Sequence, residues 1–156
     1  MRPGPAPGTE RVAPTAVLDK FYDAEMRYIA AGGARGGASF DEMAACLHPQ
    51  AVMHMGPSVP FPGDWAGIDG VERFFAVLSE TWSSMVITDV TYFSREDGVA
   101  ISMRVALTSR ATGQTAHARL AQFITFDAGL IRDFTVFYLD PLRLNEVVGA
   151  TEGVRQ

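Results

Sequence analysis

Residues 115–140 read TAHARLAQFITFDAGLIRDFTVFYLD, and this stretch decides the fold class. Apolar and polar side chains alternate along two runs, about 115–126 and 130–140, which is the period of half-buried strands. The turn formers Asp127-Ala128-Gly129 separate the runs, so the stretch predicts a hairpin of two long antiparallel strands. Pro141 ends the second strand, because proline has no amide hydrogen for a sheet ladder.

The same period extends toward the N-terminus. Two further strands are expected at about 85–95 and 99–110, with turns at 96–98 and 112–114. Residues 51–55 predict one more short strand, followed by a Pro- and Gly-rich loop over 56–67. Four long strands joined by short turns predict an antiparallel meander.

The N-terminal half has the period of helices instead. Residues 14–31 place apolar side chains on one arc at 100° per residue, and the Gly-rich stretch 32–37 ends this helix. Ser39 and Glu42 have the spacing of a capping box for a short second helix. A third helix is predicted over 68–82 and a short helical segment over 142–148.

Helices followed by a meander predict the α+β class. Long strands that share one apolar face must cover it, so we expect a cone-shaped, curled antiparallel sheet wrapped by the N-terminal helices. The interior of such a cone is a natural pocket. We expect one domain over residues 14–148, a disordered tail over 1–13 and a C-terminal tail over 149–156.

Composition limits the classes of function. The chain has 156 residues and a net charge of −5, and its basic residues are scattered, which argues against nucleic acid as a partner. Charges interrupt every apolar run before about 18 residues, and there is no signal peptide, so we expect a cytoplasmic protein that does not span a membrane. The single Cys46 lies among apolar residues and is interpreted as a buried structural thiol.

Three motifs, taken in order, resemble those of a known family. They are His48-Pro49-Gln50-Ala51-Val52-Met53-His54, the stretch from Gly67 to Phe75 (GIDGVERFF), and Phe126-Asp127-Ala128-Gly129-Leu130-Ile131 followed by Tyr138-Leu139-Asp140-Pro141. The sequence from residue 15 to about 148 thus resembles the SnoaL-like and ketosteroid-isomerase-like branch of the nuclear transport factor 2 superfamily. The resemblance implies its cone-shaped, cystatin-like α+β barrel, but this fold hosts many reactions.

The resemblance assigns roles to particular positions. His54 falls where ketosteroid isomerases have their general base, and Tyr28 falls near their oxyanion-donating tyrosine. Ala121 replaces the protonated aspartate of the oxyanion hole, so one donor of that family is missing here. The resemblance also turns the strand face with His117, Arg119 and Ala121 into the cone. There Arg119 would bind a carboxylate or an oxyanion. Arg119 can also stand for the arginine in the Asp-Arg-Asp arrangement of limonene-type epoxide hydrolases, but both carboxylate positions of that arrangement are apolar in this chain, at Ala121 and near Val136.

Glu25 stands out without reference to any family. It is the one charged side chain on the apolar arc of the first helix, between Phe21 and Tyr28. A buried carboxylate must be paired, hydrogen-bonded or neutralised, so Glu25 is either a structural link or a pocket acid–base group with a raised pKa. His54 would shuttle protons near neutral pH, unless it is simply a satisfied structural histidine.

Further side chains are expected to form the pocket. Tyr138 shares a strand face with Phe134 and Val136, Trp65 is either a helix staple or a lid, and the other expected wall residues are Phe74, Phe75 and Ala121. A metal site of His54, His117 and Glu25 is a further alternative, but no local ligand motif supports it. No metal and no cofactor are therefore expected.

These observations predict a cofactor-free acid–base enzyme of the isomerase, cyclase or dehydratase type. Its substrate would be a small hydrophobic carbonyl compound, such as a polyketide- or terpenoid-like metabolite, with catalytic residues His54, Glu25, Arg119, Tyr28 and His117. The alternatives are a non-catalytic module that binds a small molecule or a partner, and an epoxide hydrolase of the limonene type. The meander is rich in Val, Ile and Phe, which, together with the resemblance, predicts a homodimer formed through its outer face.

Overall fold

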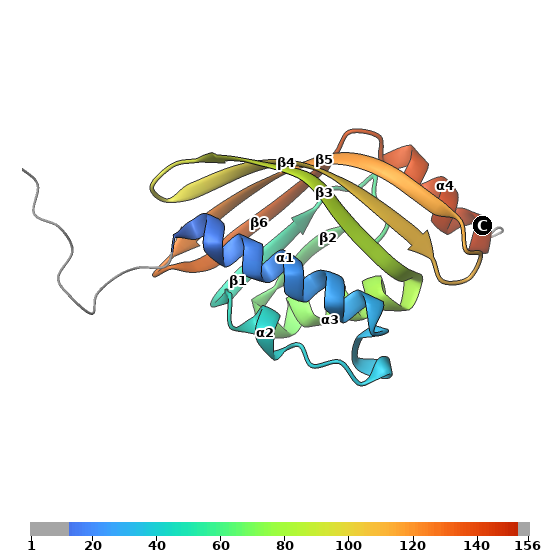
Figure 1. Ribbon diagram of the computed structural model, residues 1–156, viewed down its shortest axis with the longest axis horizontal. Coiled ribbons are helices and arrows are strands. Elements are labelled where there is room, and N and C mark those ends of the chain that lie inside the picture. Colours follow the sequence, from blue (N-terminus) through green and yellow to red (C-terminus); the bar gives the residue numbers. More distant parts are fainter. Residues whose placement is uncertain (1–12, 153–156) are drawn as a thin grey trace, which may run out of the picture.

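The structure is a computed structural model that describes residues 13–152 (Figure 1). One curled sheet of six strands is covered on its concave side by helices. In chain order the elements are α1 Pro14–Ala30, the 3₁₀ helix η1 Gly33–Gly36, α2 Asp41–Ala44, β1 Leu47–Met55, β2 Gly63–Ala66, α3 Gly67–Thr81, β3 Trp82–Ser94, β4 Gly98–Ser109, β5 Thr115–Asp127, β6 Leu130–Tyr138 and α4 Pro141–Glu152.

The predicted meander and the α+β class are confirmed. The strands lie in the order β2-β1-β6-β5-β4-β3, and β3 to β6 pair with their chain neighbours in antiparallel fashion. One pair differs from the expectation of an antiparallel sheet, because β1 runs parallel to β6. No hairpin connects these two strands, so the folding of the whole chain sets their relative direction.

Other local predictions need correction. The expected loop over 56–67 contains the edge strand β2, whose Gly63-Asp64-Trp65-Ala66 sequence shows no strand period. The capping box was wrong: Ser39 Oγ accepts a hydrogen bond from the Asp41 amide at 3.1 Å, but Glu42 pairs with Arg27 of α1. Helix α4 continues to Glu152, beyond the expected end at residue 148. The rest of both expected tails lies outside the described residues.

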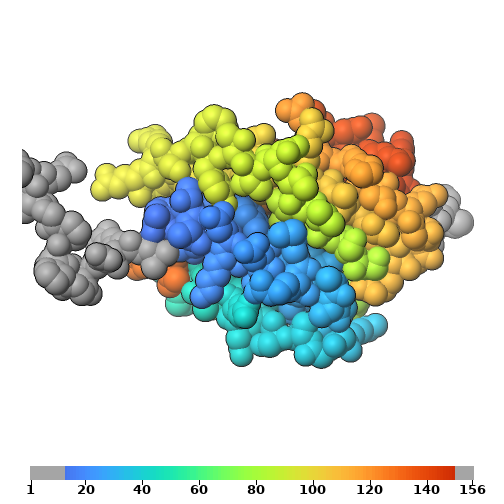
Figure 2. Space-filling model, viewed as in Figure 1, coloured from blue at the N-terminus to red at the C-terminus, as the bar shows by residue number. Residues whose placement is uncertain are grey.

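The core lies between the concave face of the sheet and helices α1 and α3. Phe21 of α1 packs against Phe75 of α3 and Phe134 of β6, with ring centroids 5.9 and 5.7 Å away. Figure 2 shows the blue atoms of α1 filling the space between the yellow-green strands and the cyan α2 region. Within residues 13–152, no helix is long and apolar enough to cross a membrane.

One buried hydrogen bond ties α1 to the sheet. The hydroxyl of Tyr22 donates to Oε1 of Gln122 on β5, and both residues are buried. The resemblance turned Arg119 and Ala121 into the cone, so Gln122 was expected on the outward face of β5. The bond matters for function because it fixes the helix that carries Glu25.

We predict that Tyr22→Phe lowers the free energy of unfolding by about 1–3 kcal/mol, because it leaves the buried Gln122 oxygen without a donor. Urea unfolding would measure the change. The matched control is Tyr92→Phe, which removes a hydroxyl bound to Asp19 at the protein surface and should cost less than about 1 kcal/mol. Equal losses for both variants would show that the bond to Gln122 has no special weight.

Candidate functional site

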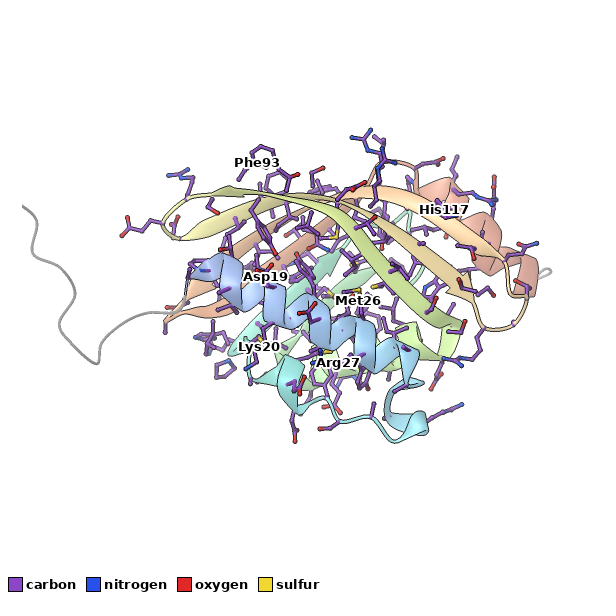
Figure 3. All side chains as sticks on the ribbon, in the orientation of Figure 1. Asp19, Lys20, Met26, Arg27, Phe93 and His117 are labelled. Atoms are coloured by element: carbon purple, nitrogen blue, oxygen red, sulfur yellow. The ribbon has the colours of Figure 1, made fainter. Side chains whose placement is uncertain are left out.

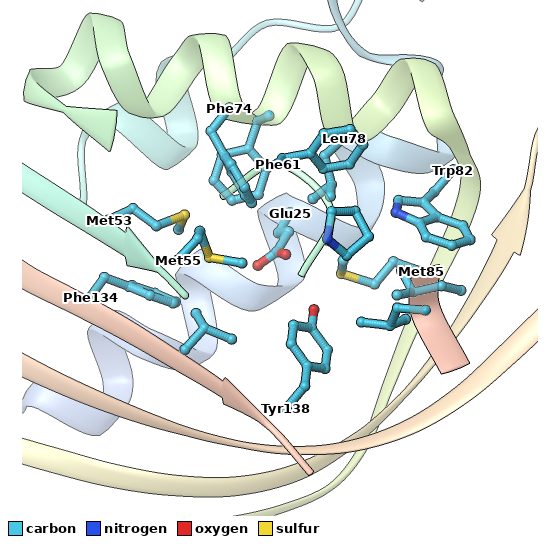
Figure 4. Close-up of a pocket in the computed structure, with 15 residues that line it drawn as sticks. Glu25, Met53, Met55, Phe61, Phe74, Leu78, Trp82, Met85, Phe134 and Tyr138 are labelled. Carbon is cyan, nitrogen blue, oxygen red and sulfur yellow. The ribbon is translucent and has the colours of Figure 1, made fainter. Parts of the chain in front are cut away.

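A cavity lies inside the cone, between α1, α3 and the inner faces of β1, β3 and β6 (Figure 4). The centres of water molecules can occupy about 40 Å³ of it, which is room for only a few waters. Its wall consists of Glu25, Met53, Met55, Pro60, Phe61, Phe74, Phe75, Leu78, Trp82, Met85, Leu107, Phe134, Val136, Tyr138 and Leu144. Most of this wall is apolar, and Glu25 is its one acidic residue.

Part of the wall comes from elements that lie outside the sheet. Pro60 and Phe61 belong to the loop between β1 and β2, and Leu144 belongs to α4. The amide of Asn145 donates to the carbonyl of Ser58 at 2.6 Å and so ties this loop to α4. A ligand larger than a few waters requires part of the wall to shift, and this loop and α4 are the parts that belong neither to the sheet nor to α1 and α3.

Glu25 has the surroundings of a functional carboxyl group. It is 7% exposed, its side chain points into the cavity, and it makes no hydrogen bond or ion pair with another residue of the described range 13–152. Burial raises the pKa of Glu25 to about 8, because the charged form loses its hydration. The structural role considered from the sequence, a link to a backbone amide or an arginine, has no support in these contacts.

Tyr138 lies across the cavity from Glu25. Its hydroxyl points toward the carboxyl group in Figure 4. Burial raises the pKa of Tyr138, and the nearby Glu25 raises it further, so the hydroxyl keeps its proton at neutral pH. The pair therefore combines a titratable carboxyl group with a neutral hydrogen-bond donor, which are the two groups that enolisation requires.

Six of the residues that the sequence predicted for the pocket line this cavity. Glu25 follows from the helical period, and the period of two places Phe134, Val136 and Tyr138 on the inner face of β6. Phe74 and Phe75 of α3 also line the cavity. Their roles in substrate binding remain predictions.

His54 lies outside the cavity, and the expectation that it faces the pocket was wrong. Its neighbours Met53 and Met55 point inward, so His54 occupies the outer face of β1. Its Nδ1 lies 2.9 Å from Asp64 of β2, and its Nε2 lies 3.0 Å from Asp133 of β6. The hydrogen bond to Asp133 raises the pKa of His54 and lowers that of Asp133. This arrangement crosslinks three strands at the sheet edge.

His117, Arg119 and Ala121 also lie on the outer face, contrary to the orientation implied by the resemblance. On β5 the buried positions are Ala116, Ala118, Leu120, Gln122 and Ile124. The side chains between them point away from the cone, so a shift of one residue separates the expected register from the observed one. Arg119 therefore cannot bind an oxyanion in the cavity, and the residues of the proposed metal site do not meet.

Two predicted residues remain, Tyr28 and Trp65. Tyr28 is buried and Trp65 is half-buried, but neither lines the cavity. Tyr28 packs edge-on against Phe40, with 5.7 Å between ring centroids, because it lies almost one turn beyond Glu25, where α2 covers α1. Trp65 packs against Phe74, and its Nε1 donates to the carbonyl of Phe61 at 3.3 Å. Trp65 thus holds the loop residue Phe61 in place.

Sequence reasoning missed the other walls of the cavity. Met53, Met55 and Met85 were not among the residues predicted for the pocket, and Trp82, which begins β3, was expected at the end of the third helix. The alternation of side chains along β1 was a usable signal, because it places Met53 and Met55 on one face of the strand and His54 on the other. The predicted strand was too short to show that the face with Met53 and Met55, and not the face with His54, points into the cone.

Fold and cavity together define the class of protein, an α+β domain whose curled sheet and helices surround a mostly apolar cavity. Comparison with known families is more specific. Residues 26–134 match the SnoaL-like domain, and the protein belongs to this family. A search of curated proteins found no match.

Solved structures support the same fold. A nuclear transport factor 2-like protein from Burkholderia thailandensis is 24% identical, with a TM-score of 0.71 over 87% of this chain and 97% of that chain. A Pseudomonas putida protein, provisionally assigned as a polyketide cyclase, is 14% identical, with a TM-score of 0.69 over 84% and 96%. TerC, co-crystallised with polyporic acid, is 16% identical, with a TM-score of 0.66 over 87% and 98%.

We predict that Glu25→Gln stabilises the protein increasingly as the pH rises from about 4.5 to about 8. In this range the folded protein keeps the Glu25 proton that the unfolded chain loses, because burial raises the pKa from 4.5 to about 8. The free energy of unfolding of the wild type therefore falls with pH, at up to roughly 1.4 kcal/mol per pH unit from this group. The glutamine side chain of the variant does not titrate, so the difference between the two proteins grows.

Urea unfolding at a series of pH values would measure this difference. Glu72→Gln is the matched control, because it makes the same substitution at an exposed position of α3. A stability difference for Glu25→Gln that stays constant between pH 5 and pH 8 would mean that Glu25 titrates like an exposed carboxyl group.

Proposed function

We propose that this protein is an acid–base enzyme that acts, without a cofactor, on a small hydrophobic carbonyl compound held in the cavity. The reaction would be of the isomerase, cyclase or dehydratase type. The observation that carries the proposal is the unpaired carboxyl group of Glu25 in an apolar cavity, opposite the hydroxyl of Tyr138. A buried carboxyl group that destabilises the fold is typical of a functional site.

In the proposed step, the ionised Glu25 removes a proton from the carbon next to the substrate carbonyl group. The electrons of that C–H bond form the enolate, and the hydroxyl of Tyr138 donates a hydrogen bond to the developing oxyanion. Glu25 then returns the proton. Return to a different carbon gives an isomer, and loss of a hydroxyl group from the β-carbon, with the same proton, gives the dehydrated product and water.

The raised pKa of Glu25 suits this chemistry. A general base is most effective when its pKa lies near the working pH, and the pKa of Glu25 is about 8. Such a group contributes about 10²–10⁴-fold to the rate. The family membership and the provisional assignment of the Pseudomonas putida protein as a cyclase agree with a proton-transfer reaction.

We predict that the protein catalyses exchange of the α-protons of hydrophobic ketones with D₂O, and that Glu25→Gln slows this exchange by about 10²-fold or more. Proton NMR on a panel of aryl alkyl ketones would measure the rates. The rate should rise with pH and level off above about pH 8, where the Glu25 base becomes fully ionised.

Three variants test this assignment of roles. Tyr138→Phe should slow exchange at every pH and leave the position of the plateau little changed, and the exposed Glu72→Gln should leave the rate unaltered. If wild-type protein and Glu25→Gln exchange the ketones equally, the enzymatic proposal fails. Ketone binding without exchange would favour the non-catalytic binding module.

We also propose that the outer face of the sheet pairs with a second copy of the chain. Phe123 and Phe137 stack edge to face there at 5.6 Å and are 53% and 54% exposed. Phe93 is 62% exposed, and in Figure 3 it points away from α1 on the far side of the sheet. Covering such aromatic side chains is favourable, since each buries a large apolar area.

We predict a particle of about twice 16.9 kDa in light scattering at micromolar concentration. Phe137→Asp should convert it to a monomer, because the substitution places a charge in the apolar contact. The control is Leu142→Asp, which alters an exposed leucine of α4 outside the sheet. A wild-type protein that stays monomeric would contradict the proposal.

A further inference from the structure

The polar groups of the cavity are few and have one property in common. The side chains of Glu25, Tyr138 and Trp82 carry these polar groups. Within residues 13–152, none of the three side chains forms a hydrogen bond or an ion pair with another residue. In Figure 4 the Tyr138 hydroxyl points inward, and the indole nitrogen of Trp82 lies on the side that faces the cavity. At neutral pH, Glu25 is mostly protonated, so all three groups can donate a hydrogen bond.

The cavity also lacks positive charge. Its fifteen lining residues include no lysine, arginine or histidine. His54, His117 and Arg119, the cations expected in the pocket, lie on the outer face of the sheet. Nothing in the described wall can neutralise a carboxylate or a phosphate, and an ionised Glu25 would repel it at low dielectric.

We infer that the cavity selects ligands by charge: it takes an uncharged compound whose acceptor oxygen faces Glu25, Tyr138 and Trp82, and it rejects anions. This inference rests on the proposed function in locating the ligand at Glu25, and it narrows the substrate class. Acids, acyl phosphates and other anionic carbonyl compounds are excluded. A ketone, an ester or a neutral enol matches the three donors.

The test uses three probes of nearly equal shape at pH 7. These are 4-methylacetophenone, which is neutral, 4-methylbenzoate, which is an anion, and 4-methylbenzamidine, which is a cation. Dissociation constants would be measured by calorimetry or ligand-observed NMR. The ketone should bind tightest, with the benzoate weaker by about 10-fold or more, since its charge enters the cavity unpaired.

A charge added at the cavity wall should change this order. Phe61→Lys places an ammonium group on the loop that lines the cavity and should improve benzoate binding relative to the ketone by about 10-fold. Gln50→Lys adds the same charge on an exposed side chain of β1 and should leave the order unchanged. Far-UV circular dichroism of both variants would check that each keeps the helices and strands of the wild type.

Several results would overturn the inference. They are benzoate binding as tight as ketone binding, amidine binding tighter than ketone binding, or no binding of any probe at millimolar concentration. The exchange assay separates this inference from the proposed function. Ketone exchange with no preference against benzoate would refute charge selection alone, whereas a clear preference without exchange in any variant would refute the acid–base enzyme alone.

Discussion

A curled sheet has one inner face, and every other feature of this protein depends on covering it. Strand side chains alternate, so β4, β5 and β6 each direct half of their residues into the cone. Water would contact a large apolar surface there if α1 and α3 did not lie across it. Phe21 and Phe75 are fully buried there and pack against each other, as part of a larger apolar core. The part that they leave open becomes the cavity.

Glu25 lies on this same covering surface, and its position has opposite consequences for stability and function. An apolar residue there would fill the wall and stabilise the fold. The carboxyl group instead keeps its proton up to about pH 8, at the expense of stability in the physiological range. Tyr22 one turn earlier on the helix binds Gln122 of β5, which holds the backbone that presents Glu25. Rigid placement and a raised pKa are both needed for a general base.

The sheet edge and the cavity are separated by a single strand. On β1, Met53 and Met55 face the cavity, while His54 between them binds Asp64 and Asp133 on the opposite face. The histidine thus secures β2, the strand that follows the loop carrying Phe61. Because the cavity has room for only a few waters, a larger ligand requires part of its wall to shift, and that loop and α4 are the parts of the wall outside the sheet and the helices α1 and α3.

The sequence by itself determined the strands and turns of the meander, the first and third helices and the inward position of Glu25. These features follow from local periods, which depend on residues a few positions apart. The tertiary structure alone decided the parallel pairing of β1 with β6, the three-strand link at His54 and the direction of His117 and Arg119. On β5 both faces carry apolar residues, Leu120 and Ile124 on one and Ala121 and Phe123 on the other. A period of two shows that a strand has two faces, but contacts with distant segments decide which face is inside.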